Sequence, residues 1–573
     1  MKVKRIVWAT FSILVLLSMV LSACVPASKT VVATEAVGPA VEPTAEPTQP
    51  PAEKKVVTFI WTQEFDTLNT LYTNMWFVTV LYPIYECQGW WFDDKNEPIP
   101  NLVTEIPTLD NGGISADGRT ITLKLRDDIK WSDGVPITSA DFKFTYDMTM
   151  SDKNAVSSRS PFDLVESLTT PDERTVVVTF KEVYAPWMAR LFSGQSGQAI
   201  IPEHILKPAF DSAGTLDTAE WSKAPTVGCG PFVFTEWQSG SFARFVANDN
   251  YWLGRPKVDE LFFRFVPDDA SMIAALVAGD GDVGTFFAYS DLPQLEAAGV
   301  KIVNSFSGYN EGWYINQHPT KGNPALKDVK VRQALAYGFN RQKLVQDLLL
   351  GRTGVAATDW DNSPWVDPSI TPYPYDPEKA KALLDEAGWK DTNGDGTRDK
   401  DGVELVLKYG TTNREVRQNT QRVAQQDLAQ IGVKLDLQSF DSDLFFASYA
   451  ENGPSANFSM DIIEYSDSPD FPDPNAVVWL CSEIPSDENP AGVSPTGLCD
   501  QELDALFQKQ ATQADFTQRQ QTMYQITKRI FDQAFWIGLW QDPDIFGFSG
   551  RMTNVKMSGA TPFFNVAEWD LTK

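Results

Sequence analysis

Histidine and enzyme motifs are nearly absent from this chain. Its 573 residues include two histidines, His204 and His318. No HExxH, GxSxG or Walker loop occurs, and no two cysteines have the CxxC spacing. A zinc site of the usual Cys/His type is therefore not expected, and the sequence offers no catalytic constellation. We predict a protein that is not an enzyme, with an exported hydrolase as a remote alternative.

Basic residues are also in short supply. There are 48 Lys and Arg against 76 Asp and Glu, a formal net charge of −28. Nucleic-acid phosphates bind basic surfaces, so a nucleic-acid partner is excluded. An acidic chain can be disordered, but the 12% of aromatic residues provides ample material for hydrophobic cores. The length predicts about two to four globular domains of roughly 100–200 residues each.

The start of the chain has the features of an export signal. Basic residues are followed by an apolar run at 6–20, and small residues lead into Cys24. This resembles a bacterial lipobox, so we predict a signal peptide at 1–23 and a lipid on Cys24; an ordinary signal peptide with an incidental cysteine is the alternative. Residues 24–54, rich in Pro, Ala and Thr, predict a disordered tether. We expect an exported chain, anchored to the outer face of the cytoplasmic membrane or in the periplasmic space.

Four cysteines follow the predicted lipidation site, an even number in an exported chain. They are Cys87, Cys229, Cys481 and Cys499, and they allow three pairings. Cys481 with Cys499 would close a short stretch rich in proline and glycine and is favoured as a local pair, with a stabilisation of about 3 kcal/mol. Cys87 with Cys229 would then be a long-range disulfide. Four free, buried thiols are the alternative.

Strand and helix patterns alternate along the body of the chain. The apolar run at 56–61 predicts a buried strand, and alternation predicts strands at 121–125 and 176–180. A capping box at 138–141 begins one helix, and the Asp-Pro-Glu at 376–378 begins another. The mixture predicts an α/β fold with mixed sheets covered by helices.

One polar loop has the ligand spacing of a calcium site. Asp391, Asn393, Asp395 and Asp399 occupy positions 1, 3, 5 and 9 of an EF-type loop. Position 12 is a glycine, whereas such loops have a bidentate glutamate there. We therefore keep two interpretations, a possible structural calcium and a plain polar turn. No cofactor is required by either.

Several motifs, spread over residues 55–573, resemble those of one protein family. They are LRDDIKWSDGVPITSADF (125–142), VGCGPFVFTEW (227–237), NDNYWLGRPKVDEL (248–261), LKDVKVRQALAYGFNRQKLV (326–345) and YDPEKAKALLDEAGW (375–389). In this order they resemble the bacterial extracellular solute-binding proteins of family 5, the dipeptide- and oligopeptide-binding components of ABC importers. Cys229 stands where the family usually has a small residue such as Thr, which favours a disulfide role. We interpret most motif residues as scaffold, and Arg332 as part of a buried ion pair.

The resemblance implies a type II periplasmic-binding-protein-like fold, with two lobes and an additional inserted domain. Lobe I would combine 55–85, 201–318 and 540–573, the inserted domain II would be 86–200, and lobe III would be 319–539. The ligand would bind between the lobes, which close around it. The implied partners are the permease subunits of an ABC transporter with their cytoplasmic ATPases. We expect a monomer.

For the ligand, the resemblance favours peptides. Peptide-binding members pair an aspartate, four residues before a proline, with the α-ammonium of the peptide. In the stretch MDIIEYSDSPDFPDPN (460–475), counting back from Pro474 gives Asp470, and a shift of register gives Asp467. A role in a surface loop is the alternative for each.

Oligosaccharides are the rival ligand class. Some family members bind β-linked sugars by stacking the rings on tryptophan or tyrosine, and Trp365 and Trp479 are candidate cleft aromatics here. Most tryptophans are core residues, so a core role is the alternative for both. The two ligand classes would be distinguished by whether Asp470 lies unpaired in the cleft or forms an ion pair with an arginine.

Overall fold

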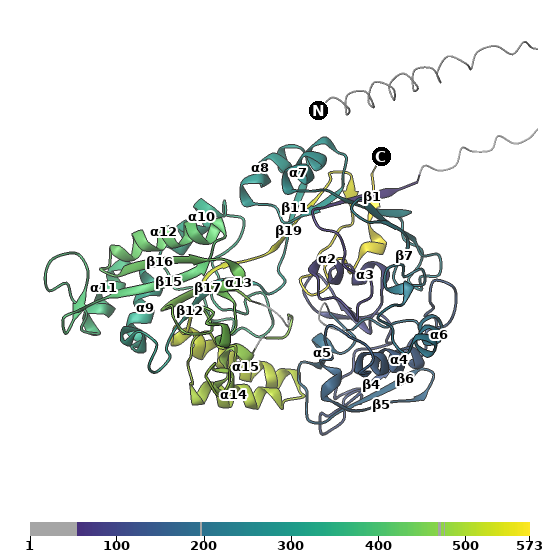
Figure 1. Ribbon diagram of the computed structural model, residues 1–573, viewed down its shortest axis with the longest axis horizontal. Coiled ribbons are helices and arrows are strands. Elements are labelled where there is room, and N and C mark those ends of the chain that lie inside the picture. The colour runs from purple at the N-terminus through teal and green to yellow at the C-terminus, as the bar shows by residue number, and fades with distance from the viewer. Residues whose placement is uncertain (1–53, 195–197, 468–470, 475, 573) are drawn as a thin grey trace, which may run out of the picture. The chain divides into compact units, whose positions relative to one another are not determined.

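The computed structural model describes residues 54–194, 198–467, 471–474 and 476–572. They belong to one compact unit that begins at Lys54 (Figure 1). The predicted signal peptide, Cys24 and the tether up to Glu53 lie outside the described residues. Within them, no helix combines the length and the apolar character that a bilayer crossing requires.

Among the described residues, the largest sheet has seven strands in the order β11-β19-β10-β1-β9-β8-β7. They are β1 (Val56–Trp61), β7 (Phe232–Gln238), β8 (Phe242–Ala247), β9 (Glu260–Phe265), β10 (Val283–Thr285), β11 (Lys301–Ser305) and β19 (Asp544–Phe548). β1 pairs in parallel with β9 and β10, and the other pairs are antiparallel. Val57, Phe59 and Trp61 of β1 are fully buried, which confirms the strand predicted for 56–61.

A second sheet has five described strands in the order β16-β15-β17-β12-β18. They are β12 (Asn310–Ile315), β15 (Val406–Thr412), β16 (Lys434–Phe440), β17 (Ile462–Ser466) and β18 (Trp536–Gln541). β15 is parallel to β16 and β17, whereas β12 is antiparallel to both β17 and β18. This sheet is therefore mixed, as the sequence predicts.

A third sheet is an antiparallel arrangement of β4 (Thr120–Lys124), β6 (Thr175–Phe180) and β5 (Val165–Asp172). Alternate residues of β4 and β6, such as Ile121, Leu123 and Val178, are buried, which confirms the two strands predicted from alternation. Smaller two-stranded sheets pair β2 (Trp90–Phe92) with β3 (Pro98–Pro100), β13 (Asp399–Lys400) with β14 (Val403–Glu404) and β20 (Met552–Thr553) with β21 (Asp570–Leu571).

Helices surround these sheets. The α-helices are α2 (Trp76–Thr79), α3 (Tyr82–Tyr85), α4 (Ser139–Met150), α5 (Trp187–Arg190), α6 (Glu203–Ala213), α7 (Asp269–Ala278), α8 (Leu292–Ala297), α9 (Val329–Gly338), α10 (Arg341–Leu348), α11 (Pro377–Glu386), α12 (Glu415–Ala429), α13 (Ser442–Phe445), α14 (Gln501–Ala511) and α15 (Phe516–Asp532). The capping box predicted at 138–141 begins α4, and Asp376 caps α11. α12 packs against β15 and β16, and α9 packs against α11 (Figure 1).

The strand pairing shifts two of the predicted lobe boundaries. Lobe I was predicted to run to 318, but β12 pairs with β17 and β18 in the five-stranded sheet. β18 likewise continues past 539 to Gln541. The chain crosses between the two large sheets at 306–309 and at 542–543, because these residues join β11 to β12 and β18 to β19. The division into lobes itself stays a prediction.

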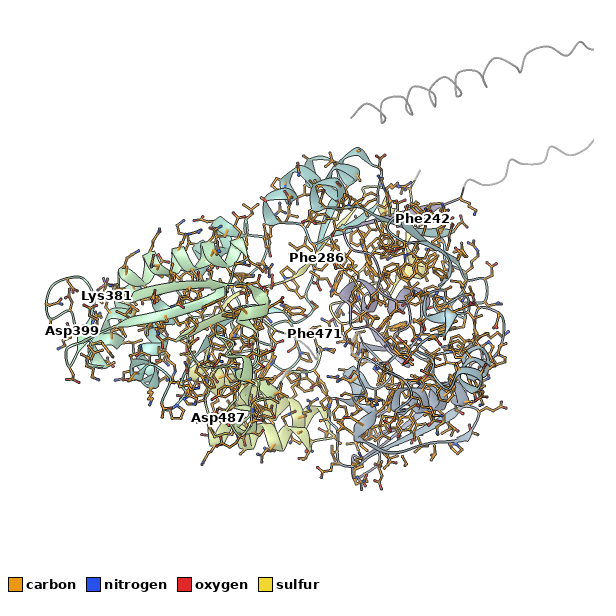
Figure 2. The ribbon with its side chains drawn as sticks, viewed as in Figure 1. Phe242, Phe286, Lys381, Asp399, Phe471 and Asp487 are labelled. Carbon is orange, nitrogen blue, oxygen red and sulfur yellow. A yellow bond between two sulfur atoms is a disulfide. The ribbon has the colours of Figure 1, made fainter. Side chains whose placement is uncertain are left out.

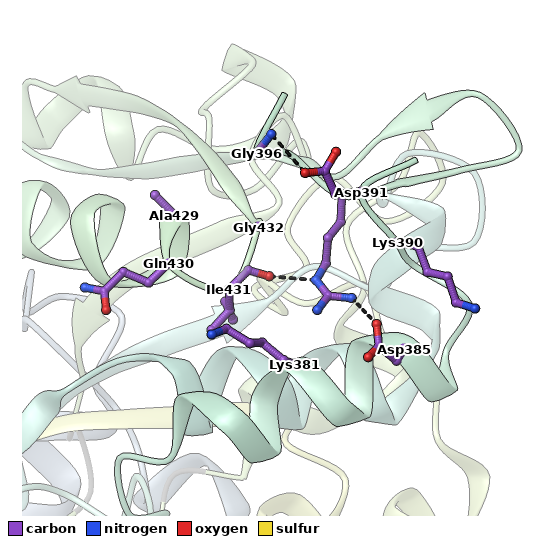
Figure 3. Close-up of a pocket in the computed structure, with 10 residues that line it drawn as sticks. Lys381, Asp385, Lys390, Asp391, Gly396, Ala429, Gln430, Ile431 and Gly432 are labelled. Atoms are coloured by element: carbon purple, nitrogen blue, oxygen red, sulfur yellow. Dashed lines mark hydrogen bonds and ion pairs between the residues drawn. The ribbon is translucent and has the colours of Figure 1, made fainter. Parts of the chain in front are cut away.

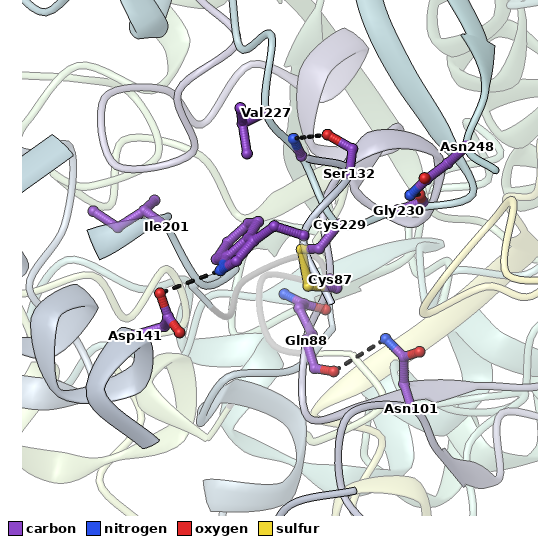
Figure 4. Close-up of a disulfide and its surroundings, with 12 residues drawn as sticks. Cys87, Gln88, Asn101, Ser132, Asp141, Ile201, Val227, Cys229, Gly230 and Asn248 are labelled. Atoms are coloured by element: carbon purple, nitrogen blue, oxygen red, sulfur yellow. Dashed lines mark hydrogen bonds between the residues drawn. A yellow bond between two sulfur atoms is a disulfide. The ribbon is translucent and has the colours of Figure 1, made fainter. Parts of the chain in front are cut away.

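Both predicted cysteine pairs lie at disulfide distance. The sulfur atoms of Cys87 and Cys229 are 1.89 Å apart, and those of Cys481 and Cys499 are 2.13 Å apart. Figure 4 shows the first pair, which joins the chain after α3 to the chain before β7. Cys87 and Cys229 are fully buried. This link therefore ties the stretch that follows α3 to the seven-stranded sheet.

Glu86, next to this disulfide, is a buried acid with no counter-charge among the described residues. Its side chain is 0% exposed, and neither carboxyl oxygen has a hydrogen-bond partner in the described part of the chain. Burial raises the pKa of Glu86 well above its ordinary value of 4.5. Folding therefore favours the neutral form of this carboxyl.

Replacing this acid should stabilise the protein at alkaline pH. Above the ordinary pKa, the unfolded chain releases the proton while the folded chain keeps it, so stability falls by up to about 1.4 kcal/mol per pH unit until the raised pKa is reached. Glu86→Gln should remove this loss and unfold at higher urea concentration than the wild type at pH 8. Glu182→Gln, the same change at an exposed position, should have no effect. Parallel pH profiles for wild type and Glu86→Gln would contradict the assignment.

Candidate functional site

Two neighbouring strands of the five-stranded sheet end at the same edge. β15 and β17 run parallel, with Gly410 opposite Ile463. Arg414 follows the end of β15 by two residues, and Asp467 directly follows the end of β17. The carboxyl ends of parallel strands are the usual ligand-binding edge of α/β sheets. We therefore take this edge as the candidate site.

The antiparallel strands of the sheet reach the same edge from the other direction. β12 begins there at Asn310, which pairs with Gln541 at the end of β18. Asp542 follows directly, and Ser466 at the end of β17 donates a hydrogen bond from Oγ to Asp542 Oδ2 at 3.4 Å. The two segments that cross to the seven-stranded sheet therefore leave from the candidate site.

Arg414 supplies a cation to this edge. It is the N-cap residue of α12 and is exposed, and its guanidinium makes no ion pair or hydrogen bond within the described residues. Burial raises the pKa of Asp542, and the positive charge of Arg414 opposes that rise, so the two side chains lie close enough to interact. Sequence reasoning missed Arg414. Its only signal was its place in the short connection between an apolar strand and a helix.

A buried ion pair fixes the helix that carries Arg414. Arg417, in the first turn of α12, donates from Nε and Nη2 to the two carboxylate oxygens of Glu311 in β12, at 2.7 and 2.9 Å. Arg417 Nη1 also donates to Thr412 Oγ1 at 2.9 Å. The side chains of the pair are 6% and 1% exposed, so these fork bonds are shielded from water. The start of α12 is thereby held to the sheet.

Asp467 is half-buried beside two stacked tyrosines. The ring centroids of Tyr314 and Tyr465 are 4.5 Å apart. Burial, followed by the charge of Asp467, raises the pKa of Tyr465 well above its ordinary value. Phe446, which is 50% exposed, packs edge-on against Tyr465 at 5.3 Å. The edge therefore combines a carboxylate with accessible aromatic surface.

Another acid of the predicted ammonium-binding stretch is already paired. Asp473 accepts hydrogen bonds from Nη1 and Nη2 of Arg519, both at 2.6 Å, and both side chains are buried. Asp470, which the proline spacing selects, lies outside the described residues. Asp467, the alternative register, is the predicted acid that the structure brings to the candidate site.

The two predicted cleft tryptophans are buried. Trp479 is 2% exposed and donates from Nε1 to Asp359 Oδ2 at 2.9 Å. Trp365 is 4% exposed and donates from Nε1 to the carbonyl oxygen of Pro472 at 2.6 Å. Neither indole presents an open face on which a sugar ring could stack. Burial raises the pKa of Asp359 to about 7, so the surroundings of Trp479 are acidic but only partly charged at neutral pH.

The predicted calcium loop folds as a turn closed by its own side chains. Asp391 accepts hydrogen bonds from two backbone N–H groups of the loop, at 2.7 and 3.1 Å. Asn393 donates to Asp395, and Asp399 accepts from Thr392. Across the described ranges, no group of three or more His, Cys, Asp or Glu side chains could hold a metal ion. The calcium site stays a prediction, and the hydrogen bonds use oxygens that calcium would need.

An open pocket of about 660 Å³ lies beside this loop, between α11 and the turn after α12 (Figure 3). Arg398 crosses it and donates to Asp385 at 2.6 Å and to the carbonyl oxygen of Ile431 at 2.8 Å. Figure 2 shows Lys381 at the end that carries α11, away from Phe471. The pocket is therefore separate from the candidate site.

Solved structures identify the class of protein to which this fold belongs. The oligopeptide-binding protein AppA from Bacillus subtilis, in complex with a nonapeptide, matches with a TM-score of 0.62 and 24% identity over 91% of this chain and 100% of that chain. NikA from Brucella suis, in complex with Fe(III)-EDTA, matches with a TM-score of 0.73 and 22% identity over 90% and 100%. The fold is that of a type II periplasmic binding protein, as predicted.

Sequence comparisons identify the family. A family model described as bacterial extracellular solute-binding proteins, family 5 Middle, matches residues 97–484. A protein of Brucella ovis named as an ABC transporter peptide-binding protein is 31% identical over 404 residues, which is 69% of this chain and 70% of the relative. AppA of Bacillus subtilis is 27% identical over 489 residues, 84% and 85%, and the nickel-binding periplasmic protein of Escherichia coli is 26% identical over 439 residues, 74% and 78%. The chain belongs to family 5 of the bacterial extracellular solute-binding proteins. It is a substrate-binding component of an ABC transporter, and this family consists of binding proteins rather than enzymes.

The calcium hypothesis makes a direct prediction. If the loop binds the ion, millimolar calcium should raise the melting temperature relative to EDTA, because a ligand of the folded state stabilises it. Asp391→Asn should abolish the difference. Asp211→Asn, at an exposed position of α6, should preserve it. Equal wild-type melting temperatures in EDTA and in calcium would discard the site.

Proposed function

We propose that this chain captures peptides for an ABC importer, with the free amino group of the peptide at Asp467 and a carboxylate of the ligand at Arg414. The observation that carries the proposal is one acid and one unpaired base just beyond the carboxyl ends of two parallel strands. Neighbouring strands are about 4.8 Å apart. Both charges are therefore within reach of a single zwitterionic ligand, and charge-assisted hydrogen bonds to its two ends would orient it.

The surroundings of the two charges suit a peptide. Phe446, which is 50% exposed, offers apolar surface for side chains, while the strand ends offer main-chain groups. Main-chain hydrogen bonds bind any extended peptide, and loosely fitting side-chain pockets then leave the sequence free. Relatives named for peptide binding, and the AppA complex with a nonapeptide, support this ligand class.

Other ligand classes have less support. Oligosaccharide stacking was predicted at Trp365 and Trp479, which are 4% and 2% exposed. A nickel complex, suggested by a relative's name, would be expected to use imidazole ligands. His204, on α6, pairs with Asp133, and His318 follows the other end of β12, away from the candidate edge. An exported hydrolase remains the remote alternative from the sequence.

We also infer the cellular setting from the sequence. The lipobox-like residues before Cys24 support a lipid anchor, and the Pro-rich stretch after it would let the binding unit extend from the membrane. A monomer at the outer face of the membrane or in the periplasmic space would deliver the ligand to permease subunits driven by cytoplasmic ATPases.

Removing either charge should weaken peptide binding at one defined end. Asp467→Asn should lower the calorimetric affinity for pentaalanine by roughly 10- to 100-fold, the value of a hydrogen bond between charged groups. N-acetyl-pentaalanine should bind the wild type equally weakly. Arg414→Gln should have the matching effect, reproduced by pentaalanine amide. Asp470→Ala distinguishes the two registers. If this variant loses affinity for pentaalanine and Asp467→Asn keeps it, then Asp470 is the acid that binds the amino group.

Controls separate these effects from unfolding. Asp152→Asn, where the side chain is fully exposed, should bind like the wild type, and all variants should keep the wild-type melting temperature within a few degrees. Unchanged affinity in Asp467→Asn, Asp470→Ala and Arg414→Gln would reject the proposed orientation of the ligand.

The ligand class can be read from the purified protein. Native mass spectrometry should detect a bound mass that fragments into amino-acid residues after release. A bound mass that fragments as hexose would instead establish the oligosaccharide alternative. Asp467→Asn should be purified without the bound mass.

A further inference from the structure

Arg519, on α15, makes an unusual set of contacts for a buried arginine. It is 4% exposed. Nη1 and Nη2 donate to Asp473 at 2.6 Å each, and Nε donates to Gln510 Oε1 at 2.8 Å. The guanidinium also lies over the ring of Trp365, 4.5 Å from its centroid. Each of its three guanidinium nitrogens therefore donates a hydrogen bond to another side chain.

One further contact of Arg519 joins two distant parts of the chain. Its Nη1 donates to the carbonyl oxygen of Ala185 at 3.3 Å, 334 residues away in sequence. Ala185 lies just before α5, whose residue Trp187 belongs to the core of the three-stranded sheet. Phe471 packs against the same core. Arg519 and Phe471 therefore both contact the predicted inserted domain.

Trp365 holds the same short segment from another side. Its Nε1 donates to the carbonyl oxygen of Pro472 at 2.6 Å. Pro472 and Asp473 are therefore fixed by two side chains that also contact each other. Asp467 lies six residues before Asp473. The residue directly before Asp467 is Ser466, the last residue of β17. Among the described residues, the chain is therefore held before Asp467 in β17 and after it at Pro472 and Asp473.

Arg529 provides a comparison on the same helix. It donates to the carboxylate of Asp500 from Nε and Nη2 at 2.9 and 2.7 Å. Asp500 is the N-cap of the neighbouring helix α14, so this pair serves local helix packing. Arg519 differs because its partners come from three remote stretches, around 185, 365 and 473.

We propose that Arg519 is a positioning residue for the ligand site: it fixes Phe471–Asp473, and with it the place of Asp467, relative to Ala185 in the predicted inserted domain. This inference rests on the proposed peptide-binding function. Arginine is required because a lysine has a single charged nitrogen and cannot hold both carboxylate oxygens, the carbonyl of Ala185 and the face of Trp365 together. The role is to orient the acid, since Arg519 itself is buried away from the ligand.

The test compares Arg519→Lys with Arg529→Lys. For each protein, calorimetry gives the ratio of affinities for pentaalanine and for N-acetyl-pentaalanine. A misplaced Asp467 recognises the free amino group less well, so Arg519→Lys should lower this ratio at least about fivefold, the lower range of coupling between sites. Arg529→Lys should keep the ratio, whatever its effect on melting temperature. An unchanged ratio in Arg519→Lys, or an equal fall in both variants, would overturn the positioning role.

A second variant covers the case in which Arg519→Lys does not fold. Trp365→Phe keeps an aromatic face beneath Arg519 but removes the N–H that bonds Pro472. Trp365→Phe should lower the ratio of the affinities for pentaalanine and N-acetyl-pentaalanine. If both variants fold, the fall should be smaller than in Arg519→Lys. An unchanged ratio would count against the inference. A wild type that binds both peptides equally would instead refute the proposed function, and the positioning role with it.

Discussion

The parallel pairing of β15 with β17 is the constraint on which the candidate site depends. Their register brings Arg414 and Asp467, which are far apart in sequence, to one edge. A slip of one residue would turn the side chains of β17 to the opposite face. The bidentate bond from Arg417 to Glu311 acts against such a slip, because it ties the helix after β15 to the strand on the other side of β17.

Local features were predictable from the sequence, and so was the distant pair of Cys87 and Cys229, but the register of remote strands was not. The capping box of α4 and the alternation of β4 follow from neighbouring residues. The sheet to which β12 belongs, and the position of Arg414, are decided by strand register between remote segments. Arg332 illustrates a partial success: it is buried as predicted, but it donates to the carbonyl oxygens of Leu326 and Gln533 at 2.7 and 2.8 Å rather than to a carboxylate.

The formal charge of −28 overstates the charge of the folded chain at neutral pH. Burial raises the pKa of Glu86 and of Glu464 well above the ordinary value, which favours the neutral form of both carboxyls. The pKa values of Asp359 and Asp544 rise to about 7 for the same reason. Several of these acids lie near the candidate edge. The negative potential there therefore increases with pH, in the direction that favours a cationic ligand group.

The connections between the two large sheets also limit how the protein can move. The described chain passes between them through 306–309 and 542–543, and Ser307 Oγ in one donates to Asp544 Oδ2 beside the other at 2.7 Å. Gly308, with φ of 87°, adopts a backbone conformation that side chains disfavour. Two short connections that lie side by side form a hinge. Such a hinge would let the two sheets rotate relative to each other about one axis and would resist sliding of one sheet past the other. Ligand binding would then select one value of the angle between the two sheets. The ligand would lie next to the hinge axis, where a small rotation displaces its contacts least.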